Sequence, residues 1–220
     1  MPDQKVRTVA ALVFNDAEPL DLFGPINAFK AACLKDESKL YQAFTIGETK
    51  GTVKIWDIDV VVEYDFADPS TPNFDILLIP GGKGTRILVD NKQFIQGLKQ
   101  LCGKAKIIAC VCTGSALLAK TGLLDGKEAT SNKKAWEWVI KQGSEVNWNC
   151  PKRWVDGINH QEGIITSAGV SAGIDMSIAL IEKLNGEDVA TRVQEHMEYN
   201  WNRDPDKDPF ANMCPGCSPQ

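Results

Sequence analysis

Histidine is scarce in this chain of 220 residues, which contains only His160 and His196. His160 lies in a polar segment typical of a turn, and His196 lies within the pattern of a late helix. Neither is placed to form a Cys-His pair, so we interpret both as structural or solvated side chains. Chemistry in which a histidine base activates a cysteine is therefore disfavoured.

The chain also lacks clusters of positive charge and long apolar runs. Its formal net charge is −5, and the pairs Lys133-Lys134 and Lys152-Arg153 are isolated, whereas a duplex-binding protein normally shows a basic face. No apolar run approaches the roughly 20 residues of a membrane-spanning helix. The N-terminus lacks the apolar core of a secretion signal. We therefore expect no nucleic-acid partner, no membrane partner and a cytoplasmic location.

Cysteine is present in an odd number, at positions 33, 102, 110, 112, 150, 214 and 217. An odd count without a secretion signal predicts reduced thiols rather than a disulfide framework. Cys214 and Cys217 form a lone CxxC, and no second pair completes the four ligands of a structural zinc site. We interpret them as a tail disulfide or incidental thiols, and we expect no metal site.

Apolar runs alternate with helical patterns, which predicts an α/β fold: a doubly wound, mostly parallel sheet with helices on both faces. We expect one domain over residues 1–201 and a polar, extended C-terminal tail over residues 202–220. Strands are predicted at 7–14, 41–47, 74–79, 106–111 and 163–167, with a hairpin or extension at 52–62 and another hairpin around 156–162. Helices are predicted at 23–34, 91–102, 113–121, 131–142, 171–184 and 186–201.

Three segments that contain candidate reactive or substrate-binding groups follow predicted strands. They contain Asp21, the loop Pro80-Gly81-Gly82-Lys83-Gly84, and Cys112. Because sites in open α/β sheets form at the carboxyl ends of strands, we expect these segments to converge.

Cys112 is the predicted nucleophile. An apolar strand ends at this residue, and Thr113-Gly114-Ser115 then begins a run of helix formers, so the cysteine occupies a strand–helix elbow. The N–H groups at a helix start favour a thiolate, which is the reactive form. Cys110 precedes the turn, and we interpret it as a core thiol.

The segments 20–25, 78–82, 109–114 and 166–175 together resemble the DJ-1/PfpI superfamily, which shares its core with class I glutamine amidotransferases. Leu-Asp-Leu-x-Gly-Pro, Cys-Thr-Gly-Ser and Ser-Ala-Gly-Val-x-Ala-Gly-Ile-Asp resemble the branch of isonitrile (isocyanide) hydratases. Ligand-binding domains of some AraC-type regulators share these signatures. The resemblance implies a homodimer that acts on a small molecule without metal or organic cofactor.

The resemblance also places a carboxyl group beside the thiol, at Asp21. Like charge should raise the pKa of Asp21, which could then donate a proton; the alternative is a helix N-cap. The Thr113 N–H could face a developing anion, with the N–H of Gly82 or Lys83 opposite, and its hydroxyl could bind substrate or water. Gly81 and Gly82 could equally serve only to form the turn.

The resemblance implies a lyase that hydrates an isonitrile to an N-substituted formamide. Cys112 attacks the carbon, Asp21 supplies the proton, and water hydrolyses the covalent thioimidate with help from Asp21 and Thr113. The alternatives are a DJ-1-like stress protein with an oxidisable cysteine and a non-catalytic small-molecule sensor. A glyoxalase or deglycase is less favoured, because threonine stands where a histidine is needed.

Overall fold

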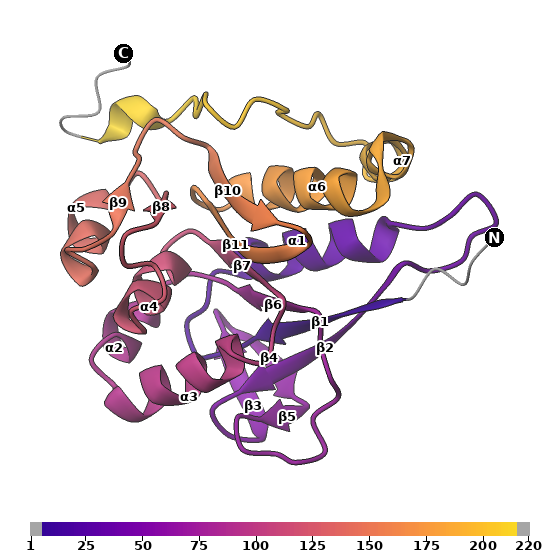
Figure 1. The fold of residues 1–220 in the computed structure, drawn as a ribbon. Helices are drawn as coiled ribbons and strands as arrows, with labels where there is room; N and C mark the ends of the chain where they lie inside the picture. Colours follow the sequence, from indigo (N-terminus) through magenta and orange to yellow (C-terminus); the bar gives the residue numbers. More distant parts are fainter. Residues whose placement is uncertain (1–5, 215–220) are drawn as a thin grey trace.

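A computed structural model describes residues 6–214 and shows an α/β fold built around one large sheet (Figure 1). The sheet has seven strands in the order β10-β11-β7-β6-β1-β2-β5. All neighbouring strands are parallel except β10 and β11, which form an antiparallel hairpin. The strands of this sheet are β1 (Arg7–Leu12), β2 (Tyr41–Gly47), β5 (Tyr64–Asp65), β6 (Ile76–Ile79), β7 (Ile107–Val111), β10 (Trp154–Asn159) and β11 (Glu162–Ser167).

Two small additions accompany the main sheet. The hairpin of β3 (Gly51–Ile55) and β4 (Ile58–Val62) lies where the alternating pattern at 52–62 predicts one. The strands β8 (Glu128–Ala129) and β9 (Asn147–Trp148) form a short parallel pair that sequence analysis missed. Two-residue strands carry too little periodic pattern to be recognised.

Helices cover both faces of the sheet. Figure 1 shows α1, α6 and α7 on one face and α2, α3 and α4 on the other. The helices are α1 (Pro19–Ala31), α2 (Thr85–Leu88), α3 (Lys92–Cys102), α4 (Gly114–Lys120), α5 (Trp136–Val139), α6 (Ala172–Asn185) and α7 (Glu187–His196). The expected doubly wound architecture is therefore confirmed.

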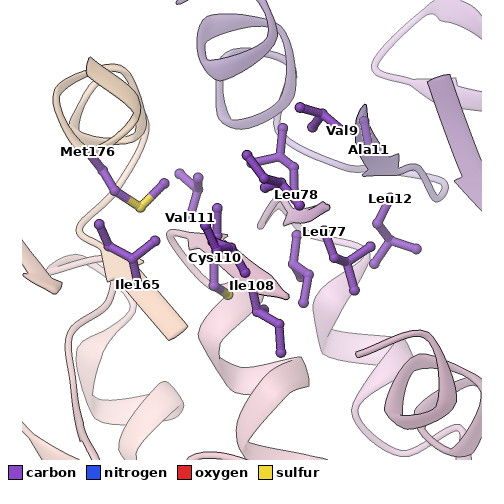
Figure 2. Close-up of a cluster of buried hydrophobic side chains, with 14 of the residues drawn as sticks. Val9, Ala11, Leu12, Leu77, Leu78, Ile108, Cys110, Val111, Ile165 and Met176 are labelled. Carbon is purple, nitrogen blue, oxygen red and sulfur yellow. The ribbon is translucent and has the colours of Figure 1, made fainter. Parts of the chain in front are cut away.

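The core lies where the central strands meet the helical layers. The four residues of β6 and the five of β7 are all buried, which is the pattern of parallel strands covered on both faces. Figure 2 shows this packing, in which Met176 of α6 approaches Ile165 of β11 beside Val111 of β7. This rigid centre fixes where β6 and β7 end.

Three predicted helices have different bounds in the structure. The first begins at Pro19 rather than residue 23, because Pro19 already occupies the favoured first helical position. The segment 131–142 is helical only from Trp136, in α5 and the following 3-10 turn Ile140–Gln142. The last helix ends at His196 instead of residue 201.

The described part of the tail is only partly extended, because it contains turns and the 3-10 helix Ala211–Met213, and it packs onto the domain. The Arg153 N–H donates to the Pro205 carbonyl at 2.7 Å, and the Asp208 N–H donates to the Pro151 carbonyl at 3.0 Å. A buried ionic cluster, which we call the C-terminal clamp, fastens this segment and consists of Lys133, Arg153, Asp175 and Asp208.

The cysteines depart in part from the prediction of reduced thiols. Cys33, Cys102, Cys110, Cys112 and Cys214 are free, but Cys150 takes part in a disulfide bond. The Cys214 thiol donates to the Lys133 carbonyl at 3.4 Å, so this residue belongs to the packed segment. Cys217 lies outside the described residues.

Candidate active site

Cys112 occupies a sharp corner between β7 and α4. Its φ of 59° is in the left-handed region, which non-glycine residues rarely adopt. Its N–H donates to the Ser167 and Ala168 carbonyls at 3.2 and 3.3 Å. Its carbonyl accepts from the hydroxyls of Ser115 and Ser131 at 2.9 and 2.8 Å. These hydrogen bonds hold the corner in its strained conformation.

Asp21 is completely buried in the first turn of α1. One carboxyl oxygen accepts from the Gly81 N–H at 2.9 Å, and the other accepts from the Val170 N–H at 3.1 Å. Burial raises the pKa of Asp21 to about 7, although these hydrogen bonds and one with the Cys112 thiol favour the charged form. A carboxyl group in this state can hold or release a proton near neutral pH.

The Cys112 thiol lies beside this carboxyl group and is only 5% exposed. Burial raises the pKa of Cys112 well above its ordinary value, and the charge of Asp21 raises it further. Hydrogen bonds from the Thr113 N–H and the Asn132 side chain act in the opposite direction. Cys112 and Asp21 are therefore a coupled pair that keeps one proton over a wide pH range.

Asn132 is a site residue that sequence analysis missed. Its Oδ1 accepts from the Ala135 N–H at 2.9 Å, which turns Nδ2 toward the sulfur. A Cβ at Gly169 would lie 2.1 Å from that Nδ2, so glycine makes room for the amide. A serine and an asparagine before a helical pattern indicate only a cap, and the contact with Cys112 depends on tertiary structure.

The Thr113 hydroxyl is occupied within the protein. It accepts from the Gly82 N–H at 3.0 Å, donates to the Gly82 carbonyl at 3.3 Å, and lies 3.2 Å from the Thr85 hydroxyl. The structure thus brings Thr113 and Gly82 together. The Gly82 N–H, one of the groups expected to face the substrate, already donates to the Thr113 hydroxyl. Within residues 6–214, the Lys83 N–H has no recorded hydrogen-bond partner.

Gly81 is closely confined between Asp21 of α1 and Thr113 at the start of α4. A Cβ there would lie 2.6 Å from both N and Oγ1 of Thr113 and 2.9 Å from Asp21 Oδ2. Real Cβ atoms do not make such contacts. Glycine at this position, just after β6, therefore allows the Gly81 N–H to reach the Asp21 carboxyl group. The glycine loop therefore does more than turn the chain.

The remaining sequence candidates lie elsewhere or in the core. Cys110 is fully buried in β7, as expected for a core thiol. His160 is exposed in the turn between β10 and β11, and His196 is exposed at the end of α7. Neither histidine is among the groups that act on Cys112.

Within residues 6–214, no group of three or more His, Cys, Asp or Glu residues is arranged to hold a metal ion. In the same range, no helix combines the length and apolar character needed to cross a membrane.

Comparison with known sequences identifies one family over most of the chain. The sequence profile of the DJ-1/PfpI family matches residues 7–183. An isonitrile hydratase of Pseudomonas putida is 29% identical over 192 residues, covering 87% of this chain and 78% of the relative. A deglycase of Thermococcus kodakarensis is 28% identical over 141 residues, covering 64% and 80%.

Solved structures show the same fold. A ThiJ/PfpI family protein from Pseudomonas syringae matches with a TM-score of 0.76 and 24% identity, covering 91% of this chain and 78% of that one. Drosophila melanogaster DJ-1beta matches with a TM-score of 0.73 and 18% identity, covering 90% and 100%.

Proposed function

The chain belongs to the DJ-1/PfpI family, and from that premise we propose that it is a cysteine-dependent lyase that hydrates an isonitrile to an N-substituted formamide. The observation that carries this proposal is the buried pair of Cys112 and Asp21, in which the pKa of the carboxyl group is about 7 and no histidine takes part. The similarity to an isonitrile hydratase supports the choice of substrate.

The first step uses the single proton that the pair retains. The raised pKa of Cys112 keeps this proton on the sulfur, so the Asp21 carboxylate first accepts it. The resulting thiolate attacks the terminal carbon of R–N≡C, and the Asp21 carboxyl group then gives the proton to the same carbon. One C–S bond and one C–H bond form, which gives the thioimidate R–N=CH–S–Cys112. Covalent attachment divides one difficult addition of water into two easier steps.

Water completes the reaction. The Asp21 carboxylate accepts a proton from the water whose oxygen adds to the carbon and passes it to the nitrogen. The hydroxyl group that remains on the carbon gives up its proton, which moves to the sulfur as the C–S bond breaks. Cleavage of the C–S bond then releases R–NH–CHO and returns the thiol. We assign the Lys83 N–H as a donor to the developing charge, because the neighbouring N–H groups of Gly81 and Gly82 are bonded within the protein.

The test is turnover of phenyl isonitrile, followed by formation of N-phenylformamide. We expect Cys112→Ala to abolish turnover and Cys33→Ala to retain it, because Cys33 is a partly exposed free thiol outside the site. Intact-mass analysis of wild type should show one adduct of substrate mass. Equal rates in wild type and Cys112→Ala would contradict the proposal.

A parallel assay separates this function from its alternatives. Methylglyoxal should not be consumed, because the site has no histidine base. Mild peroxide should oxidise Cys112 slowly, because the thiol is buried and its pKa is raised. Rapid methylglyoxal turnover would favour a glyoxalase, and rapid oxidation of Cys112 without turnover would favour a stress-response protein.

We further propose that the protein is a cytoplasmic homodimer. Leu20 and Phe23 of α1 are 40% and 43% exposed, and exposed apolar side chains on one helix suit an interface between copies. Five of the described cysteines are free thiols, as in a reducing compartment, and the disulfide-bonded Cys150 is the exception. Light scattering of wild type and Phe23→Glu tests the dimer, which the charge should weaken.

A further inference from the structure

Arg86 differs from the other arginines of the chain in what its guanidinium contacts. The side chain of each of the other four arginines donates a hydrogen bond to a protein acceptor; these residues are Arg7, Arg153, Arg192 and Arg203. Within residues 6–214, no hydrogen bond or ion pair is recorded for the Arg86 guanidinium. Its planar donors are therefore available to a ligand.

Trp138 holds Arg86 in place. The guanidinium carbon lies 3.5 Å from the centre of the indole ring, so the two planar groups stack. Arg203 makes a comparable contact with Trp201 at 4.5 Å, but it also pairs with Glu182 and Glu187. Arg86 has the stacking partner without the anions.

The two elements that carry this stack are both attached to the neighbours of Cys112. Arg86 follows Thr85, whose buried hydroxyl lies 3.2 Å from that of Thr113. Trp138 lies in α5, which follows Asn132, whose amide faces the sulfur. The charge that acts on Arg86 is that of Cys112, and it opposes the lowering of the Arg86 pKa by burial. A positive, donor-rich group is thus held next to the Thr85–Thr113 contact that adjoins Cys112, close enough for the two charges to interact.

We propose that Arg86, braced by Trp138, is a specificity-determining residue that selects an electrophilic substrate carrying a carboxylate. This inference rests on the proposed function for the reaction, and it adds the chemical class of the substrate. A guanidinium matches the planar geometry of a carboxylate through two parallel hydrogen bonds. Bound in this way, the substrate would present its reactive carbon to Cys112 and its acidic end to Arg86.

Alkylation of Cys112 tests the subsite without any isonitrile. Iodoacetate and iodoacetamide react identically, in that the thiolate forms a C–S bond as iodide leaves, but only iodoacetate carries a carboxylate. Rates are measured by mass spectrometry of the peptide containing Cys112. We expect Arg86→Gln to lower the iodoacetate-to-iodoacetamide rate ratio about fivefold or more, and Arg86→Lys to retain part of it. Arg203→Gln is the matched control, since it removes another Trp-stacked arginine remote from Cys112.

Turnover is then compared for phenyl isonitrile and 4-isocyanobenzoate. We expect Arg86→Gln to reduce kcat/KM about tenfold for the carboxylate substrate and less than twofold for the neutral one. An unchanged alkylation ratio would overturn the inference. Equal slowing of both alkylating reagents would also overturn it, because Arg86 would then act on the thiolate rather than on the ligand.

The two assays distinguish the two proposals. If the iodoacetate-to-iodoacetamide rate ratio depends on Arg86 but the protein turns over neither isonitrile, the carboxylate subsite is supported and the hydratase is refuted. If the protein turns over both isonitriles but the alkylation rate ratio is the same in Arg86→Gln and wild type, the hydratase is supported and the subsite is refuted.

Discussion

Asn132 and Lys133 are neighbours in the chain, yet their side chains belong to two buried polar clusters of different character. Asn132 faces the Cys112 thiol beside Asp21. Lys133 lies in the C-terminal clamp, 3.4 Å from Asp208. Both clusters bury carboxyl groups, but only the clamp supplies cations to pair with them.

This difference decides what each cluster can do. Asp21 receives hydrogen bonds from neutral donors only, so burial raises the pKa of its carboxyl group to about 7. In the clamp, Nε and Nη2 of Arg153 both lie 2.6 Å from Asp175 Oδ2. A buried carboxyl group without a cation can exchange its proton, whereas one held by a guanidinium stabilises a chain segment.

The largest expected effect is on catalysis by the first cluster. Asp21→Asn removes the exchangeable proton. The NH2 group of the new amide also faces the N–H of Gly81 or Val170, so that two hydrogen-bond donors oppose each other. We expect kcat/KM for phenyl isonitrile to fall about 10²- to 10⁴-fold, the usual contribution of general acid–base catalysis. Circular dichroism checks that the variant folds. A loss below tenfold would show that Asp21 is not the proton source.

The second effect is on stability and belongs to the clamp. Arg153→Met leaves Asp175 and Asp208 buried without their guanidinium, so we expect the free energy of unfolding in urea to fall by about 3–5 kcal/mol. The exposed Arg203→Met variant is the control, with an expected change of about 0–1 kcal/mol. Similar changes in the two variants would mean that the clamp contributes no more than surface ion pairs.

The pH dependence of stability sharpens the comparison further. The folded-state pKa of Asp21, about 7, lies above its ordinary value of 3.8, so the folded protein binds the extra proton between these values. Asp21 therefore lowers stability progressively as pH rises from about 4 to 7, by about 4 kcal/mol in all. Urea unfolding at several pH values measures this slope. In Asp21→Asn the slope should decrease, and an unchanged slope would assign it to other groups.

The smallest effect concerns Asn132. Asn132→Ala removes a hydrogen bond that favours the thiolate, so the pKa of Cys112 should rise further. We expect alkylation of Cys112 by iodoacetamide at pH 8 to slow about three- to tenfold, or about 0.7–1.4 kcal/mol, which is the usual net contribution of one hydrogen bond. Asn132→Asp keeps an acceptor for the Ala135 N–H and brings a like charge to the sulfur, so it should react more slowly still. Unchanged rates in both variants would contradict this role.

Sequence patterns predicted the parts of the molecule that depend on local order. The buried strands β6 and β7 and the elbow at Cys112 follow from apolar runs that end abruptly, and the convergence of Asp21 with Cys112 follows from the rule for parallel sheets. Asn132, Arg86 and the clamp depend on contacts between distant segments. For Asp208, the polar segment predicts only an extended tail, and the fold shows that Lys133 and Arg153 contact its carboxyl group.

Gly81 shows that the reactive groups can all be present in the sequence and still not be correctly positioned. One methyl group at this position would contact Thr113 and Asp21 together, and it would displace them while leaving every reactive side chain in the sequence. A substitution at a residue that takes no part in the chemistry can therefore abolish activity while the reactive residues stay unchanged. A relative that retains the cysteine and the aspartate could still be inert, and the smallest residue of the loop is the one to inspect first.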